Sequence, residues 1–313
     1  MVMNQKTHRI EPLESLGVIH KAIPDLQKEV ALDFYSISNV GSSEVTPEHW
    51  NQLALHIKEH YDDYEAFVVV HGTNTMCYTA AALSFALQNL SKPVIFTGAL
   101  LPINELAGDG RMNLIFAVRA AQLDLAEVCI ALGPRVLRAT RSKKVADSFL
   151  QTFDSPTFGA LADFSTGIRL HSQRMVRRKR TLTCKPSFDA NVIALTLLPG
   201  MNDAILDATL AAKPHGIVLR AYGPGMFPES LFPWLRKLHT AKIPIVMTSQ
   251  SIRSAIDLHR YRKQLALEDL GVISAKNMTF ETATVKLMWA LTQAKGSRLQ
   301  ELMEKSLVGE LDE

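Results

Sequence analysis

The sequence predicts an α/β protein of two domains, each built on a largely parallel β-sheet. First, four apolar residues, Phe67–Val70, run without a polar interruption, as in a strand buried on both faces of a parallel sheet. Second, a small polar turn and a helical pattern follow this strand, and the same order recurs along the chain. Third, the length of 313 residues suits two domains, because a domain usually has roughly 100–200 residues.

The N-terminal elements follow one another with short turns between them. Thr46 and Pro47 mark a helix start, because threonine caps a helix N-terminus and proline suits its first position. Asp109 and Gly110 precede a second helix with periodic apolar residues, and the stretch 135–144 is expected to be a basic loop. Strands are expected at 32–40, 67–70, 93–98 and 128–132.

This repeated pattern is typical of a doubly wound, flavodoxin-like sheet with right-handed crossovers. We predict that the domain holding this sheet spans residues 1–168. Residues 169–190 interrupt the pattern and form a linker or hairpin, and residues 191–313 form a smaller α/β domain. Asn202 and Thr279 are expected to cap helices of the second domain. Its strands are expected at 192–195, 217–219 and 245–247.

The predicted linker carries a basic run: Arg174, Arg177, Arg178, Lys179 and Arg180. Nucleic-acid binding is one interpretation of such a run. A solvated connector is the other. We favour the connector, since no aromatic residues interleave with the charges and the formal charge of the whole chain is only +3. We therefore expect no nucleic-acid partner.

The cysteines and the N-terminal stretch indicate the compartment. Cys77, Cys129 and Cys184 lie far apart in the sequence, which favours free thiols in a reducing compartment. The N-terminal stretch MVMNQKTHRIEPLES is polar and contains no signal-peptide core. No apolar run approaches the roughly 20 residues that cross a bilayer. We therefore expect a cytoplasmic protein that does not bind membranes.

Hydroxyl and amide side chains follow the 67–70 strand in the turn His71-Gly72-Thr73-Asn74-Thr75. The carboxyl ends of parallel strands form the edge at which open α/β sheets bind ligands. Backbone N–H groups at the start of the next helix offer a place for an oxyanion. The sequence therefore predicts nucleophile or oxyanion chemistry at this edge.

Several segments of the chain resemble the cytoplasmic, type I bacterial L-asparaginases, in family order. HGTNTM at 71–76, with Tyr78-Thr79-Ala80, resembles the family signature HGTDTM-x-YTA with one change. Together the matches cover nearly the whole chain and imply the two-domain, asparaginase-like fold. The further matches are KPVIFTG at 92–98, Asp109-Gly110 with Asn113, Arg138 through Arg141 to Lys144, Pro199-Gly200, YGPG at 222–225, and the closing Gly309-Glu310-Leu311.

The resemblance implies a catalytic set of Thr73, Lys144 and Asn74. In the family, a first threonine in a TGGTI turn is thought to attack the side-chain amide. A second threonine, with a lysine and an aspartate, polarises the nucleophile or a water. Thr73 matches the second threonine, Lys144 matches the lysine and Asn74 stands at the aspartate. The substrate-binding residues implied are Ser42, Ser43, Gly72, Thr73, Asn74 and Ala99.

The first departure from the family is that no TGGTI occurs in the chain. In a 2-1-3-4-5 strand order, the strand before that turn lies between the strands assigned to 32–40 and 67–70. Without it, two rows of backbone N–H and C=O groups would lack partners, which is costly when they are buried. We therefore expect either a coding start upstream of Met1 or another segment in that place, and we favour the upstream start.

The second departure is Asn74, whose amide cannot supply the negative charge of an aspartate. Proton transfer by Lys144 and Thr73 survives this change in one interpretation, while recognition of an amino acid suffers. In the other, the site has decayed. Third, Met226 replaces an asparagine, and His8-Arg9-Ile10 stands where some relatives place a tyrosine. Ser251 and His259-Arg260 replace a cysteine and glycines near a regulatory site of type I relatives, which argues against that regulation.

The remaining candidates have plainer interpretations. His71 is expected to be a packed turn histidine, because no carboxylate is placed in the sequence to orient its ring. Asp109 is either a structural carboxylate at a helix start or an acid near the active site. Gly223-Pro224-Gly225 lacks the Lys-Ser/Thr pair of a phosphate loop. No His/Cys cluster with metal-ligand spacing was identified, so no metal and no cofactor are expected.

Three functions are compatible with these residues. The leading hypothesis is an L-asparaginase-like amidohydrolase that converts L-asparagine and water to L-aspartate and ammonia, impaired in the chain as given. The second is a catalytically inactive, asparaginase-like protein that binds a small amino-acid-like ligand or a partner. The third is a tRNA-dependent amidotransferase subunit, which only the basic run at 174–180 favours. The resemblance implies a small-molecule amide substrate and a homodimer or homotetramer.

Overall fold

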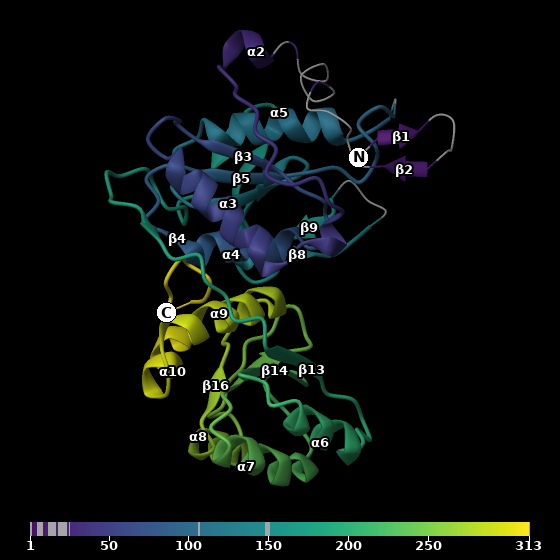
Figure 1. Ribbon diagram of the computed structural model, residues 1–313, viewed down its shortest axis with the longest axis vertical. Helices are drawn as coiled ribbons and strands as arrows, with labels where there is room; N and C mark the ends of the chain where they lie inside the picture. Colours follow the sequence, from purple (N-terminus) through teal and green to yellow (C-terminus); the bar gives the residue numbers. More distant parts are fainter. Residues whose placement is uncertain are drawn as a thin grey trace. The chain divides into compact units, whose positions relative to one another are not determined.

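The computed structural model describes residues 2–4, 9–11, 17, 24, 26–105, 107–147 and 151–312. The chain divides into two compact units, Met1–Pro186 and Ser187–Glu313. Each unit has its own β-sheet (Figure 1). Two short strands, β11 (Ile168–Leu170) and β12 (Thr183–Cys184), lie in the stretch predicted as a linker or hairpin, and both belong to the first unit.

A six-stranded mixed sheet forms the centre of the first unit, in the order β11-β10-β7-β6-β5-β3. Its continuous apolar strands run parallel, as the sequence predicted, and β5 and β6 are fully buried, whereas β3 at the edge is only partly buried. They are β3 (Phe67–Val70), β5 (Val94–Thr97) and β6 (Val128–Ala131). The strands antiparallel to their neighbours are β7 (Arg135–Arg138), β10 (Ala160–Phe164) and β11.

Helices cover both faces of this sheet (Figure 1). α5 (Gly110–Ala121) packs on β5, and α4 (Met76–Ala86) packs on β6 and against α3 (Pro47–Glu59). α4 is buried along almost its whole length, so it forms the interior of the unit. The shorter elements are β1 (Val2–Asn4), β2 (Arg9–Glu11), α2 (Leu26–Glu29), β4 (Leu87–Gln88), β8 (Lys143–Lys144), β9 (Phe153–Asp154), and 3-10 turns at Ser42–Glu44 and Ala139–Arg141.

Two predicted elements of this unit are wrong. The strand expected at 32–40 does not form, and residues 31–41 have no regular secondary structure. A strand needs a neighbouring ladder, and among the described residues β3 is the last strand at that end of the sheet. The basic loop expected at 135–144 is instead β7, a 3-10 turn and β8, because β7 pairs with β6 and β10.

The second unit is a four-stranded, fully parallel sheet in the order β13-β14-β15-β16. The predicted caps are confirmed: Asn202 accepts a hydrogen bond from the Ala204 amide, and Thr279 accepts one from the Thr282 amide. The strands are β13 (Val192–Thr196), β14 (Gly216–Ala221), β15 (Ile245–Ser249) and β16 (Val272–Ser274). The helices are α6 (Asp203–Ala211), α7 (Phe232–Thr240), α8 (Arg262–Asp269), α9 (Phe280–Gln293) and α10 (Ser297–Glu304), with a 3-10 turn at Glu229–Leu231.

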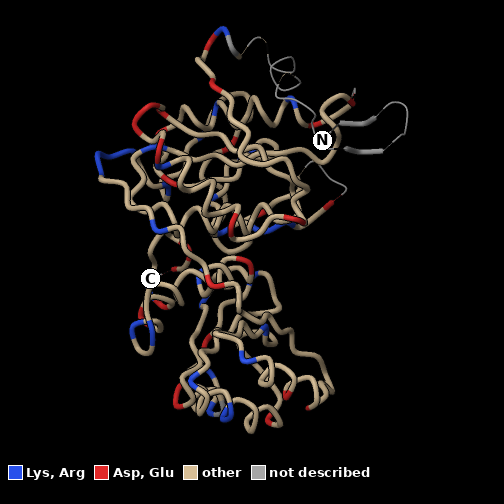
Figure 2. Tube along the Cα trace, viewed as in Figure 1, with Lys and Arg blue, Asp and Glu red and all other residues tan. Residues whose placement is uncertain are grey.

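Basic and acidic residues are interspersed along the described chain (Figure 2). In the basic run, Arg174 donates to the Asp124 carbonyl and carboxylate, and the Arg177 guanidinium donates to the carbonyls of Ala121 and Leu123. Two of the five basic side chains therefore tie the run to the end of α5. Among the described helices, none has the length and hydropathy that crossing a bilayer requires.

A fully buried ion pair joins Lys286 of α9 to Glu310 near the end of the chain. Both side chains are 0% exposed. The ammonium group also donates to two backbone carbonyls, and the carboxylate accepts from the amides of Leu307 and Val308. Because every polar atom of the pair has a partner, removing one charge leaves the other buried and uncompensated.

We therefore expect Glu310→Gln to lower the free energy of unfolding by about 3–5 kcal/mol, the usual cost of breaking a buried pair. Urea unfolding followed by tryptophan fluorescence measures it. The control is Asp207→Asn, which removes the exposed pair with Lys237 and should cost about 0–1 kcal/mol. Equal effects of the two substitutions would contradict this account of the buried pair.

Candidate active site

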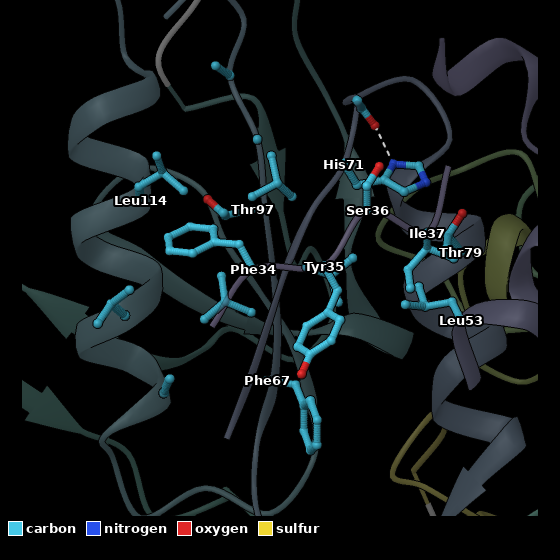
Figure 3. A pocket seen from close by; sticks show the side chains of 18 of the residues that line it. Phe34, Tyr35, Ser36, Ile37, Leu53, Phe67, His71, Thr79, Thr97 and Leu114 are labelled. Carbon is cyan, nitrogen blue, oxygen red and sulfur yellow. Dashed lines mark hydrogen bonds between the residues drawn. The ribbon is translucent and has the colours of Figure 1, made fainter. Parts of the chain in front are cut away.

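A cavity of about 1420 Å³ runs along the edge of β3 in the first unit. In Figure 3, Phe34 and Leu114 line one side of it and Leu53 lines the other, so the walls beside the strand are largely apolar. The polar end lies at the turn after β3. All the site residues predicted from the sequence line this one cavity: Ser42, Ser43, Gly72, Thr73, Asn74, Ala99 and Lys144.

The edge of β3 that faces this cavity has backbone groups available for pairing. On the other edge, the amides of Phe67 and His71 donate to carbonyls of the β5 segment. Successive residues of a strand direct their backbone groups to alternate sides, so Val68 and Val70 direct theirs toward the cavity. An edge of this kind is a template for an added strand.

Thr73 and Lys144 meet at the polar end of the cavity. The Lys144 Nζ lies 3.0 Å from the Thr73 Oγ1 and donates a hydrogen bond to it. Thr73 comes from the turn between β3 and α4. Lys144 comes from β8, which pairs with β9 through the buried Phe153. Two segments 71 residues apart in sequence therefore form the amine–hydroxyl contact.

Two further oxygens surround the same amine. The Asn74 Oδ1 accepts a hydrogen bond from Lys144 Nζ at 2.7 Å, and the Asp147 carboxylate forms an ion pair with it. Asp147 is not among the residues predicted from the sequence, although an acidic residue three positions after Lys144 is a visible signal. Asp147 supplies the negative charge that Asn74 lacks, but from a side chain that is 83% exposed.

Ser42 and Gly72 touch at the entrance to the turn. A Cβ placed on Gly72 would lie 2.7 Å from the Ser42 Oγ, so only glycine allows this approach. The Thr75 hydroxyl donates to the Ser42 carbonyl at 2.6 Å and links the 3-10 turn to the start of α4. Ser42 is therefore held against the turn, whereas Ser43 is exposed and donates to the Glu44 carboxylate.

Asp109 acts as a structural carboxylate. Its oxygens accept from the amides of Leu100 and Leu101 and from the Asn113 side chain. These bonds order the loop that carries Ala99 into the cavity. Asp109 itself does not line the cavity. Of the two roles the sequence left open, the structural one fits this geometry.

His71 is held by its own turn. Its Nδ1 donates to the Gly72 carbonyl at 2.7 Å, which leaves the lone pair on Nε2. Burial lowers the pKa of His71, so the ring is neutral near pH 7. Its buried Nε2 has no hydrogen-bond partner among the residues that the structure describes. This is the packed turn histidine that the sequence predicted.

The other departures from the family pattern belong to other parts of the chain. His8 is outside the described residues, and Arg9 and Ile10 lie in β2. Met226 pairs with Tyr222 in a backbone bridge of the second unit, where the exposed Ser251 also lies. Of the described residues named here, none is in the cavity lining.

The geometry fits proton transfer and small-amide chemistry. A lysine ammonium has three N–H donors, and Lys144 has three acceptors: Thr73, Asn74 and Asp147. The amine becomes a base toward the Thr73 hydroxyl once it has lost a proton and its acceptors rearrange. Asp147 is the most exposed of the three and the easiest to displace.

Comparison with known proteins agrees with this fold. Residues 1–176 match the family described as Asparaginase, N-terminal, and residues 191–303 match the Glutaminase/Asparaginase C-terminal domain. L-asparaginase 1 of Escherichia coli K12 is 35% identical over 276 residues, covering 86% of this chain and 81% of that protein.

Two further relatives show the breadth of the likeness. A glutamyl-tRNA(Gln) amidotransferase subunit of Methanobrevibacter smithii is 29% identical over 324 residues, covering 100% of this chain and 74% of that one. The crystal structure of L-asparaginase I from Vibrio cholerae superposes with a TM-score of 0.88 at 29% identity, covering 100% and 96% of the two chains. With both of its domain families matched in order, this chain belongs to the asparaginase family.

Proposed function

We propose that this chain is an amidohydrolase that cleaves the side-chain amide of L-asparagine or a related small amide at a low rate. The observation that carries the proposal is the 3.0 Å contact between Lys144 Nζ and Thr73 Oγ1 at the polar end of a cavity. Ser42, Gly72 and Ala99 shape the same end of that cavity.

The reaction needs a base, a nucleophile and a leaving group. Neutral Lys144 takes the Thr73 hydroxyl proton while that oxygen accepts a proton from the attacking hydroxyl or water. The new C–O bond forms, the C–N bond breaks and the proton held by Lys144 is passed to the departing nitrogen. Where a hydroxyl attacks, this step leaves an ester on the chain. A water then attacks the ester carbon, a second C–O bond forms, the ester C–O bond breaks and the hydroxyl regains its proton. The net change is amide plus water to carboxylate plus ammonium, so no cofactor is required.

We expect Lys144→Met and Thr73→Val to lower ammonia release from L-asparagine by about 10²–10⁴-fold, the usual contribution of a positioned proton-transfer group. Ammonia production by the purified chain measures this. Lys143→Met, on the same short strand but outside the cavity, is the matched control and should retain activity. An active Lys144→Met variant would remove the basis of the proposal.

Asn74 and Asp147 both contact Lys144, and only Asp147 is charged, which gives a second prediction. Asn74→Asp restores a carboxylate to the cavity wall, and we expect kcat/KM for L-asparagine to rise about 10-fold or more, since a charged hydrogen bond contributes about 1.5–3 kcal/mol. Asp147→Asn should lower activity in the parent chain and change it little in the Asn74→Asp background. Additive effects in the double variant would show that the two positions do not substitute for each other.

We further propose that the attacking hydroxyl belongs to a strand that pairs with β3 along Val68 and Val70. Support comes from the cavity-facing backbone groups of that edge and from the coil at 31–41 across the cavity. A fusion upstream of Met1 of an apolar strand ending in TGGTI should increase ammonia release. The same fusion ending in VGGTI should not, because it lacks the hydroxyl. Equal rates of the two fusions would argue against this placement.

A second function is favoured by the crowding of Lys144. Three acceptors already contact its amine, which suits a non-catalytic protein that binds a small amino-acid-like ligand. Two results together would identify this alternative. Calorimetry would show binding of L-asparagine or L-aspartate by a chain that releases no ammonia, and Asn74→Asp would not produce ammonia release.

We also propose a cytoplasmic homodimer or homotetramer that acts on a small-molecule amide. The three cysteines, all within the described residues, form no disulfide, which suits a reducing compartment. Light scattering of the purified chain in solution tests the assembly.

A further inference from the structure

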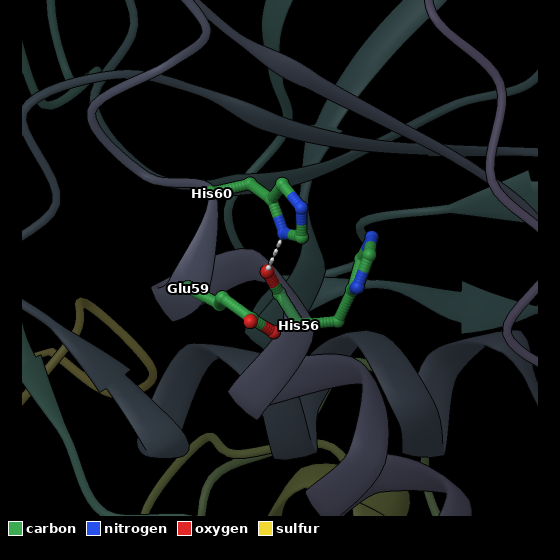
Figure 4. A group of neighbouring side chains, drawn as sticks. All are labelled: His56, Glu59 and His60. Carbon is green, nitrogen blue, oxygen red and sulfur yellow. Dashed lines mark hydrogen bonds between the residues drawn. The ribbon is translucent and has the colours of Figure 1, made fainter.

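The last turn of α3 carries two histidines and a glutamate on one face. His56, Glu59 and His60 are spaced i, i+3 and i+4, so their side chains project from neighbouring positions on the helix surface (Figure 4). One ligand atom from each lies within 4.8 Å of the others. This H-x-x-E-H pattern contains no cysteine, so it is not among the His/Cys clusters considered in the sequence.

The hydrogen bonding of His60 prepares it as a ligand. Its Nδ1 lies 3.0 Å from the His56 carbonyl, which can only accept, so Nδ1 carries the proton and Nε2 carries the lone pair. Metal-bound histidines usually donate their second ring N–H to a carbonyl or carboxylate in this way, which sets the tautomer and the ring orientation. His56 is half-buried beside His60, with ring centroids 4.3 Å apart, so the two imidazoles lie next to each other.

The rings are also held by Tyr35, from the coil at 31–41. Tyr35 packs against both, with ring centroids 5.0 Å from His56 and 5.1 Å from His60. Tyr35 is itself fixed by a 2.8 Å hydrogen bond to the Tyr64 hydroxyl, which donates to Asp33. The two imidazoles are therefore positioned by contacts other than a metal, whereas the exposed Glu59 is free to rotate toward them.

We propose that His56, His60 and Glu59 bind a divalent transition-metal ion of the Zn²⁺ class, with a further coordination position open to water. Two imidazoles and a carboxylate are ligands that zinc accepts, and imidazole favours such ions over Mg²⁺ and Ca²⁺. Ligand atoms around tetrahedral zinc lie roughly 3.3 Å apart for metal–ligand bonds of about 2.0 Å. In the structure the three ligand atoms lie within 4.8 Å of one another, so binding draws them closer by side-chain rotation. The site is independent of the proposed amidohydrolase, since none of its residues contacts Thr73 or Lys144 in the structure.

The test is Zn²⁺ titration of the full, untagged chain in competition with a chromophoric chelator. We expect one ion per chain and a Kd that rises about 10–100-fold in His60→Asn and in His56→Asn, with a smaller rise in Glu59→Gln. His259→Asn is the matched control, because it removes an exposed histidine that pairs with Glu268 in the second unit, and it should leave the Kd unchanged. Excess Mg²⁺ should not displace the zinc.

A spectroscopic readout separates a site from surface adsorption. Co²⁺ bound by imidazole and carboxylate in a low-coordinate site has visible absorption bands, which should appear with the parent chain and vanish with His56→Asn/His60→Asn. Circular dichroism verifies that the double variant is folded, and Glu59→Gln alters only an exposed side chain. The proposal is wrong if the double variant binds Zn²⁺ as tightly as the parent chain, or if the parent binds it no more tightly than Mg²⁺.

Discussion

The parallel pairing of β3 with β5 decides where the chemistry of this chain lies. Val70 pairs with Thr97, so both strands end at the same level and their turns emerge side by side. The approach is so close that a Cβ on Gly98 would lie 2.2 Å from the His71 carbonyl oxygen. Only glycine satisfies this constraint. The hydroxyls and amides of the turn after β3 therefore share a sheet edge with the loop after β5. Asp109 orders that loop by accepting hydrogen bonds from its backbone amides.

Charge at this edge is distributed differently from what the turn sequence alone suggests. The amine of Lys144 is brought in by a separate two-stranded ribbon, and its hydrogen-bonding capacity is filled by one hydroxyl, one amide and one carboxylate. The carboxylate, Asp147, stands on the solvent side of the amine and is exposed. A charge there is screened by water and contributes less to substrate recognition than one on the cavity wall would. We therefore attribute the proposed low rate of amide cleavage to the replacement of a carboxylate on the cavity wall by the exposed Asp147.

The same cavity connects the two sites. Its polar end holds Thr73 and Lys144, and its walls include His56 and His60 of α3. The coil at 31–41 also lines this cavity, and it is positioned by edge-on and tilted ring contacts of Tyr35 and by the hydrogen bond of its hydroxyl. Side-chain contacts thus take the place of a strand ladder on this side of the sheet. These contacts leave the cavity open along β3. A segment that pairs with β3 would occupy this cavity.

The sequence by itself determined the strands with continuous apolar runs, the helix caps at Asn202 and Thr279, and the residues of the turn after β3, because each depends on local periodicity or local hydrogen bonding. The family resemblance added the pairing of Thr73 with Lys144. Only the tertiary structure decided that Asp147 joins them, that 32–40 remains coil and that 135–144 forms strands. These outcomes depend on partners distant in sequence. A strand forms where another backbone completes its hydrogen bonds, and a carboxylate interacts with Lys144 only where folding brings the two side chains together.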